Sequence, residues 1–268
     1  MQTPNQLRFL MCRPEHFAVS YVINPWMDPA SWARDKRAHL AATREWYALH
    51  DKLEELGARV ELVAPAPGLP DLVFTANAGV VLDRRVLLAR FRHPERGREE
   101  PHFAAAFRDL QARGLFWMGY GPRSDAAAQH VVRDLFAQEV VALELADARF
   151  YHMDTALCPL SGGEVMYLPS AFTAAGQAAI RERVCAEDRI EIEMDDGCRL
   201  AANAVCAGRS VILSAASARL RAELTARGYR VVETPLPSFL RSGGSAFCLT
   251  LRLDRQSREA SASERAAA

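Results

Sequence analysis

Chemically active side chains stand far apart in this sequence of 268 residues. Cys248 lies between the apolar residues Phe247 and Leu249, and a cysteine thiolate is a strong nucleophile. His152 can act as a general acid and base, and Asp154 follows it two positions later, so both side chains would point to one face of a strand. A thiol and an imidazole that meet in one pocket would suit covalent catalysis. Taken alone, each residue is more often structural, because free cysteines are commonly buried in a core.

An internal repeat predicts how these distant segments come together. Gly57 follows a predicted helix and precedes Asn77 by 20 residues, with a Pro-containing loop between them. Gly228 precedes Cys248 by 20 residues in the same setting. Asn203 lies in an Ala-Asn-Ala segment like that of Asn77, and an apolar strand follows each of them. The repeat therefore relates segments on both sides of the chain.

The repeated unit is a strand, a turn, a strand, a helix and a further strand. Such units cannot close a core alone, so they bury it against one another, and a closed ring leaves few free strand edges. The equivalent inner strands would then converge on one axis. The residues expected to line a central pocket are Asn77, His152, Asp154 and Cys248. Asn203 is expected to be structural or a pocket wall.

Strand-like and helix-like segments alternate along the whole chain, which predicts an α/β fold. The expected strands are 7–12, 18–23, 59–63, 72–82, 85–91, 115–120 and 246–253. The expected helices are 28–56, 101–113, 125–137, 171–184 and 215–227. A single domain over 1–253 is predicted, with a disordered polar tail at 254–268. After Gly114 the repeat requires one connecting strand and one inner strand that the sequence does not contain.

Composition excludes several classes of protein. The 33 basic and 33 acidic side chains balance, which argues against nucleic-acid binding. The chain has no apolar run of about 20 residues, so no membrane partner is expected. The first residues do not resemble a signal peptide. Six scattered cysteines predict neither disulfides nor a zinc site, and together these features favour the cytoplasm.

The sequence resembles the guanidine-modifying superfamily, which has the pentein fold. It is most similar to the arginine dihydrolase domain of bifunctional arginine dihydrolase/ornithine cyclodeaminase proteins, over about residues 8–253. The matching motifs are residues 11–14 (MCRP), 21–27 (YVINPWM), 74–79 (FTANAG), 119–124 (GYGPRS), 151–155 (YHMDT) and 243–250 (GGSAFCLT). The resemblance implies a pseudo-fivefold α/β propeller of ββαβ units. One unit lacks its inner strand, where the superfamily carries a Phe-Glu-Gly-x-Gly-Asp motif that this chain does not have.

The resemblance also implies roles for individual residues. Cys248 corresponds to the nucleophile and His152 to the general acid/base, while Asp154 would bind the guanidinium or orient the imidazole. Deiminases carry aspartate where Asn77 stands. A carboxylate only accepts hydrogen bonds and suits a cationic guanidinium, whereas an amide can also hold a neutral ureido group. Asn77 therefore predicts a second hydrolysis.

Further residues are expected to bind the rest of the substrate. Arg123 would grip a carboxylate, because the planar guanidinium binds it bidentately, and Arg90 would assist. Asp71 and Asn24 are weaker candidates, and Asn24 is equally typical of a turn before Pro25. Glycines 243 and 244 predict a close backbone approach beside the nucleophile.

The implied function is a hydrolase that acts on free arginine through a thiouronium adduct and gives ornithine, carbon dioxide and two ammonia molecules. Two other enzymes stay open: a methylarginine hydrolase, and a deiminase that stops at citrulline. A non-catalytic binding or scaffold protein is the alternative from another class. No metal or organic cofactor is expected. The partner would be arginine or a methylated arginine, and the open ring would allow a homo-oligomer.

Overall fold

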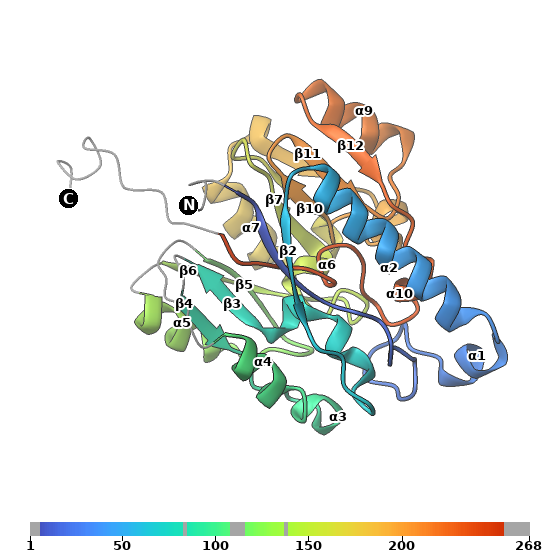
Figure 1. Ribbon diagram of the computed structural model, residues 1–268. Helices are drawn as coiled ribbons and strands as arrows, with labels where there is room; N and C mark the ends of the chain where they lie inside the picture. The colour runs from blue at the N-terminus through green and yellow to red at the C-terminus, as the bar shows by residue number, and fades with distance from the viewer. Residues whose placement is uncertain (1–5, 83–84, 108–115, 137–138, 255–268) are drawn as a thin grey trace.

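The described residues form five small β-sheets in a mixed α/β fold (Figure 1). The computed structural model describes residues 6–82, 85–107, 116–136 and 139–254. The strands are β1 (Arg8–Cys12), β2 (Arg59–Val63), β3 (Gly79–Leu82), β4 (Arg85–Leu88), β5 (Phe116–Tyr120), β6 (Val140–Glu144), β7 (Leu157–Pro159), β8 (Val165–Tyr167), β9 (Arg189–Glu191), β10 (Val205–Ala207), β11 (Ser210–Leu213), β12 (Arg230–Glu233) and β13 (Leu251–Arg252).

Helices connect these strands. The α-helices are α1 (Pro29–Arg34), α2 (Ala38–Glu55), α3 (Pro94–Gly97), α4 (Glu100–Ala106), α5 (Ala128–Phe136), α6 (Met153–Ala156), α7 (Ala174–Arg183), α8 (Met194–Cys198), α9 (Ala218–Ala226) and α10 (Pro237–Leu240). Four short 3-10 helices are described: η1 (Pro70–Val73), η2 (Thr75–Ala78), η3 (Pro169–Ala171) and η4 (Ala186–Asp188).

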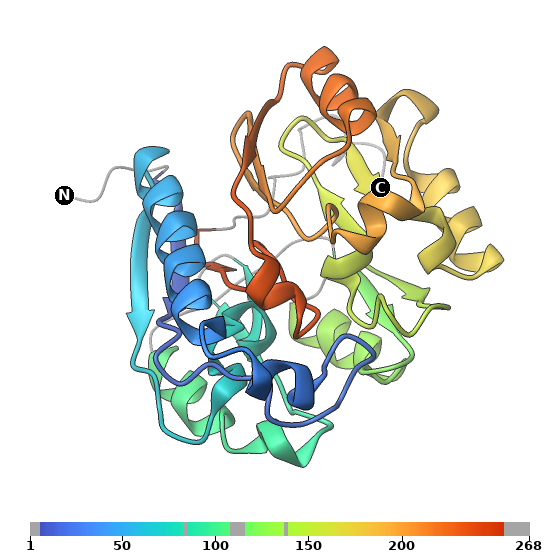
Figure 2. The same ribbon diagram turned by 90° about the vertical axis from the view of Figure 1, so that its right-hand side faces the viewer.

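Three sheets follow the predicted repeat. In one of them β10 pairs antiparallel with β11, helix α9 follows, and β12 returns parallel to β11. Strands β7, β8 and β9 repeat this order around α7. The third sheet joins the two ends of the chain, because the last strand, β13, pairs with β1, and β2 follows after α2. In Figure 2 the red C-terminal segment with α10 crosses the middle of the molecule, and the other helices lie around it.

The other two sheets have two strands each. Strands β3 and β4 form an antiparallel hairpin without a third strand among the described residues. Strands β5 and β6 are parallel, and the described chain contains no antiparallel inner partner for β5. The sequence repeat predicts a missing connecting strand and a missing inner strand at this junction. Residues 108–115, which join the two sheets, lie outside the described residues.

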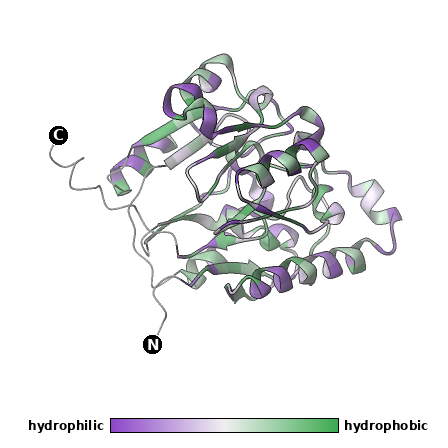
Figure 3. Cartoon of the chain, turned by 90° about the horizontal axis from the view of Figure 1, so that it is seen from above, coloured by the Kyte–Doolittle hydropathy of each residue, from purple (hydrophilic) through white to green (hydrophobic). Residues whose placement is uncertain are grey.

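Helix α2 shows how the sequence pattern sets the packing. Ala42, Trp46, Leu49 and Leu53 recur at helical spacing and are buried on one face. Side-chain oxygens cap other helices by accepting backbone N–H bonds, as Ser217 does for α9. Figure 3 shows helices that carry both hydrophilic and hydrophobic residues, as expected for elements between core and solvent. None of the helices in the described ranges combines the length and the apolar character needed to cross a bilayer.

Several predicted elements differ from the structure. Residues 18–23 form a loop, not a strand, and the helix expected over 28–56 is split into α1 and α2 around Asp35–Arg37. Most of the strand expected over 72–82 is a pair of 3-10 turns, followed by β3. Asp254, which we assigned to the tail, accepts a bond from the Arg8 backbone at 2.9 Å. The rest of that tail lies outside the described residues.

The largest correction concerns the inner strands. The strand expected over 246–253 is reduced to β13, so Cys248 lies in a turn just before it. Asn77, Asp154 and Asn203 likewise precede β3, β7 and β10. The polar residues therefore come from turns that enter the inner strands, and not from the strands themselves. A turn lets a buried polar side chain bond to nearby backbone, which the alternating faces of a strand do not offer.

Candidate active site

Cys248 lies in a tight turn that begins with two glycines. Gly243 has φ of 78°, which favours glycine. A Cβ on Gly244 would lie 2.6 Å from Cε1 of Phe74 and 3.3 Å from Cβ of Cys248, so the backbone approaches closely as expected. The backbone amides of Ser245 and Cys248 both donate to Oδ1 of Asn203, at 3.0 and 3.1 Å. The turn is thus held by a side chain from another repeat.

The sulfur of Cys248 is buried between two polar side chains. It donates to Oδ2 of Asp154 at 3.0 Å and accepts from Nδ2 of Asn203 at 3.1 Å. Burial raises the pKa of the Cys248 thiol well above its ordinary value, and the Asp154 carboxyl raises it further. Burial also raises the pKa of Asp154 itself. The Cys248 thiol is therefore protonated at pH 7.

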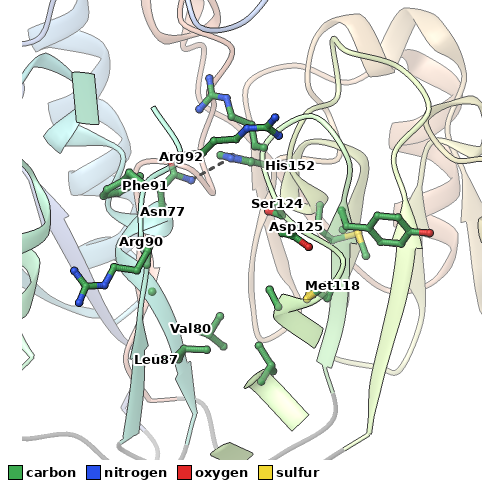
Figure 4. Close-up of a pocket in the computed structure, with 18 of the residues that line it drawn as sticks. Asn77, Val80, Leu87, Arg90, Phe91, Arg92, Met118, Ser124, Asp125 and His152 are labelled. Atoms are coloured by element: carbon green, nitrogen blue, oxygen red, sulfur yellow. Dashed lines mark hydrogen bonds between the residues drawn. The ribbon is translucent and has the colours of Figure 1, made fainter. Parts of the chain in front are cut away.

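His152 and Asp154 do not share a strand face, contrary to the prediction. His152 precedes the short helix α6, and Asp154 lies in its first turn. The helical turn directs the Asp154 carboxyl to the sulfur, whereas Nδ1 of His152 lies 3.4 Å from Nδ2 of Asn77 (Figure 4). Burial, and then the positive charges of Arg123 and Arg96, lower the pKa of His152 well below 6.5. The imidazole is therefore neutral at pH 7.

Arg96 fixes the orientation of the Asn77 carboxamide. Its Nη1 donates to Oδ1 of Asn77 at 2.6 Å, so the NH2 end of the amide turns toward His152. Arg96 is 2% exposed, and Glu99 holds its guanidinium through bonds of 2.7 to 3.1 Å. The sequence prediction missed Arg96. The only signal was its spacing of three residues from Glu99, which fits an ion pair on one helical turn.

Arg123, which we expect to bind a carboxylate, is half-buried beside Tyr151. Its Nη2 donates to the carbonyl of Ile23 at 3.1 Å, and its guanidinium stacks over the ring of Tyr151 at 4.5 Å. Its Nε is buried and has no hydrogen-bond partner in the described structure. Part of the guanidinium is therefore free to bind a ligand.

The weaker substrate-binding candidates differ in their surroundings. Asp71 is buried, and its Oδ1 has no partner among the described residues. Asn24 uses both ends of its amide within the protein, donating to Ser242 and accepting from Trp26. The side chain of Arg90 is 91% exposed and pairs with Glu100 at 2.8 Å. Asp71 can therefore still accept from a ligand, whereas Asn24 serves the turn and Arg90 lies at the rim.

Two neighbouring cavities contain these groups. The larger has a volume of about 1040 Å³ and lies between the β3–β4 hairpin and β5 with α5 (Figure 4). His152 and Asp154 line the larger cavity, Cys248 lines the smaller one, and Asn77 and Arg123 line both. Val80 and Leu87 extend the larger cavity as an apolar wall. The predicted residues thus meet where the inner strand of the β5–β6 sheet is absent from the described chain.

Hydrogen bonds link the four polar turns in series. The Ala76 amide donates to the carbonyl of Cys248 at 3.2 Å, and the Phe247 amide donates to that of Asn203 at 3.1 Å. Nδ2 of Asn203 donates to the carbonyl of Asp154 at 3.0 Å. The series stops between Asp154 and the Asn77 turn, where, among the described residues, the longer contact of Asn77 with His152 at 3.4 Å spans the gap. Each turn is therefore positioned by its neighbour.

Comparison with known proteins identifies relatives over nearly the whole chain. No protein-family model matches. The bifunctional arginine dihydrolase/ornithine cyclodeaminase ArgZ of Synechocystis sp. is 43% identical over 93% of this chain. This chain spans only 38% of that relative's length. An N(G),N(G)-dimethylarginine dimethylaminohydrolase of Mycobacterium tuberculosis is 35% identical, and the match covers 94% of this chain and 87% of the relative.

Solved structures are also similar to this chain over nearly its whole length. The N-terminal domain of ArgZ bound to substrate, described as an arginine dihydrolase, superimposes with a TM-score of 0.88. It is 41% identical, and the match covers 94% of this chain and 99% of that domain. A further structure shows an ArgZ domain variant covalently bound to a reaction intermediate, also with a TM-score of 0.88.

Proposed function

Because this chain belongs to the guanidine-modifying superfamily of arginine dihydrolases and dimethylarginine dimethylaminohydrolases, we propose that it hydrolyses the guanidino group of arginine. The proposal depends on one observation: a thiol, an imidazole, a carboxyl and a carboxamide converge at two neighbouring cavities that share Asn77 and Arg123. Cys248 is the nucleophile and His152 the general acid and base. Arginine is the substrate, and no cofactor takes part.

The substrate cation activates the nucleophile. Before substrate binds, the Cys248 thiol is protonated, because burial and Asp154 raise its pKa, and the His152 imidazole is neutral because its pKa is lowered. A guanidinium placed against the Asp154 carboxylate adds positive charge next to the sulfur. Opposite charge favours the ionised form of a thiol. The thiol proton then passes to His152 as the substrate binds.

The first hydrolysis proceeds through a covalent adduct. The Cys248 sulfur bonds to the guanidino carbon, His152 returns its proton to one nitrogen, and ammonia leaves with the electrons of the broken C–N bond. A thiouronium group remains on the sulfur. Water gives a proton to His152 and adds to the same carbon, the C–S bond breaks, and the thiolate is restored. The product is a ureido group.

Asn77 permits a second hydrolysis of the ureido group. Arg96 holds its oxygen, so its NH2 end can donate to the ureido oxygen. A second attack by Cys248 releases another ammonia and leaves a thiocarbamate, which water cleaves to a carbamate. The carbamate loses carbon dioxide and gives ornithine. Arg123 and Asp71 have unpaired buried polar atoms for the amino-acid end of the substrate.

Product analysis tests this function. We expect the protein to convert arginine to ornithine with two ammonia molecules per ornithine, and Cys248→Ser to form neither product. Citrulline as the sole end product would reject the second hydrolysis and leave the first. If folded protein consumed no arginine, the proposed enzyme function would be wrong. Asn77→Asp is expected to shift the end product toward citrulline, since its carboxylate holds the ureido group poorly.

Two specific observations support second candidates. The 35% identity to a dimethylarginine dimethylaminohydrolase favours methylated arginine as substrate, and consumption of dimethylarginine in place of arginine would establish it. The lack of the Glu motif favours a binding protein. The nearby glutamates do not replace the missing carboxylate, since Glu99 pairs with Arg96 and Glu100 with Arg90. Labelling of Cys248 by a haloacetamidine, blocked by arginine, distinguishes an enzyme from a scaffold.

The five sheets are, in this proposal, the units of one pseudo-fivefold ring. Three sheets repeat the same strand order, and the hydrogen-bonded turns belong to four different sheets. The β5–β6 sheet is the unit without an inner strand in the described chain. The ring is therefore interrupted where the larger cavity lies.

A further inference from the structure

Asn203 makes more contacts with the nucleophile than its predicted structural role requires. Its side chain is fully buried. Nδ2 lies 3.1 Å from the Cys248 sulfur, 2.9 Å from Oδ2 of Asp154 and 3.0 Å from the Asp154 carbonyl. Oδ1 accepts the backbone amides of Ser245 and Cys248. One carboxamide thus contacts the reacting atom, the neighbouring carboxyl and the backbone that carries the nucleophile.

The surroundings fix which end of the amide faces the sulfur. Oxygen and nitrogen of a carboxamide are assigned from their hydrogen bonds. Two backbone N–H donors converge on one end of the Asn203 side chain, so that end must be the oxygen. The NH2 group is therefore directed at the sulfur and at Asp154, which are both acceptors once the thiol has ionised.

We propose that Asn203 is a catalytic residue whose NH2 group donates a hydrogen bond to the Cys248 sulfur and stabilises the thiolate for attack. The opposite end of the amide holds the turn that carries the sulfur, so the donor and the nucleophile move as one unit. Asn203 also bonds to the Asp154 carboxyl and keeps it beside the sulfur. The step that this accelerates, attack on a guanidino carbon, rests on the proposed function.

The thiolate needs such a donor because its surroundings oppose ionisation. Burial and the Asp154 carboxyl raise the pKa of Cys248, whereas the Ser245 amide and the Asn203 side chain lower it. Hydrogen bonds to charged groups are stronger than those between neutral groups, and a buried charge without one is costly. The neutral amide can stabilise the thiolate without bringing a positive charge that would repel the substrate.

Alkylation of the thiol tests the inference without any substrate. The rate of Cys248 modification by iodoacetamide would be followed against pH by peptide mapping, which separates Cys248 from the other cysteines. We expect Asn203→Ser and Asn203→Asp to move the midpoint upward by about one pH unit or more. Gln177→Ser is the control, because it also removes a side-chain amide, one that donates to the Phe172 carbonyl and lines neither cavity. Its midpoint should stay unchanged.

The outcomes are decisive even if a variant is unstable. A folded Asn203→Ser protein with an unchanged midpoint would overturn the inference. If both Asn203 variants unfold, the side-chain NH2 resonances of Asn203 in the native protein decide. Their chemical shifts should change with pH at the same midpoint as the alkylation rate. Chemical shifts that do not change with pH would overturn the inference. A normal thiol response without arginine hydrolysis would refute only the proposed function, whereas arginine hydrolysis with an unmoved midpoint would refute only the role of Asn203.

Discussion

At the scale of the residue, the hydrogen bonds to two carboxamide oxygens decide where the NH2 groups of these side chains point. Asn77 and Asn203 are both carboxamides in repeat-related turns, yet their oxygens face different donors. Arg96 holds the oxygen of Asn77, and two backbone amides hold that of Asn203. Each NH2 group is left for the reaction centre, one near His152 and the other at the Cys248 sulfur.

Releasing Asn77 from Arg96 should change the product. Arg96→Met alone would leave the Glu99 carboxylate buried without a partner, so Glu99→Gln is combined with it. The freed amide can turn over and oppose the ureido oxygen. We therefore expect the ratio of ornithine to citrulline to fall several-fold. Arg98→Met, which removes an exposed guanidinium, is the control. An unchanged ratio in a folded double variant would contradict this role of Arg96.

The neutral state of His152 predicts how stability depends on pH. Its pKa in the folded protein is well below 6.5, so the unfolded chain binds more protons as the pH falls below 6.5. Stability should therefore decrease on acidification, by up to about 1.4 kcal/mol per pH unit from this group. Urea unfolding at pH 7.5 and 5.5 measures it. His152→Gln should lose less stability over this range than the wild type, and an equal loss would contradict the prediction.

At the scale of the element, the site is built from turns and short helices that precede strands. Gly244 illustrates the constraint, because Phe74 packs on the backbone where a side chain would begin. The Cys248 turn and the Asn77 turn are thereby pressed together. The strands fix where each turn lies, and the turns hold the polar side chains of the candidate site.

Gly244→Ala tests this packing. The added methyl group must displace Phe74 or the Cys248 turn, and we expect a loss of about 1–3 kcal/mol in the free energy of unfolding. The kcat should fall more than the KM rises, since the nucleophile moves. Gly97→Ala, where the methyl group meets no atom within 4 Å, is the matched control. Recovery of the free energy of unfolding in the double variant Gly244→Ala, Phe74→Leu would identify the clash with Phe74 as the cause.

The sequence allowed the sheet strands to be predicted better than the turns. Residues 8–12 and 59–63 were recognised as strands because apolar and β-branched residues mark them. The Asn77 and Cys248 segments are equally apolar and were also predicted as strands, but they are 3-10 or irregular turns. Their conformation is fixed by bonds to other repeats, such as that between Ala76 and Cys248. A local pattern does not contain that information.

The candidate site was also predicted only in part. The repeat spacing placed Asn77 and Cys248 in equivalent positions, and the structure places them beside the same cavity. Arg96 and the sulfur contact of Asn203 were missed, because each depends on a partner that is distant in sequence. Arg90 lines the larger cavity with a side chain that is 91% exposed, and its part in substrate binding stays a prediction.

At the scale of the whole molecule, the first and last strands depend on each other. Phe9 pairs with Arg252 and Leu10 with Leu251, and the Arg8 backbone donates to Asp254. Cys248 lies three residues before β13. The position of Cys248 is thus set by the pairing of the two ends of the described chain.

Shortening the chain tests this dependence. A protein ending at Asp254 should keep both its melting temperature and its arginine turnover. A protein ending at Thr250 lacks β13 and leaves an edge of β1 unpaired, so we expect it to lose cooperative unfolding in calorimetry. Equal melting temperatures of the two proteins would show that β13 does not stabilise the sheet that it forms with β1 and β2.

This closure also has a consequence during synthesis on the ribosome. The strand that completes the β1 sheet follows β1 by more than two hundred residues, so β1 must wait with one edge open while they emerge. Contacts of such long sequence separation form slowly, and exposed edges promote aggregation. The Cys248 turn therefore cannot be held in place before β13 has emerged and paired with β1, and fragments released earlier would be substrates for chaperones or proteases.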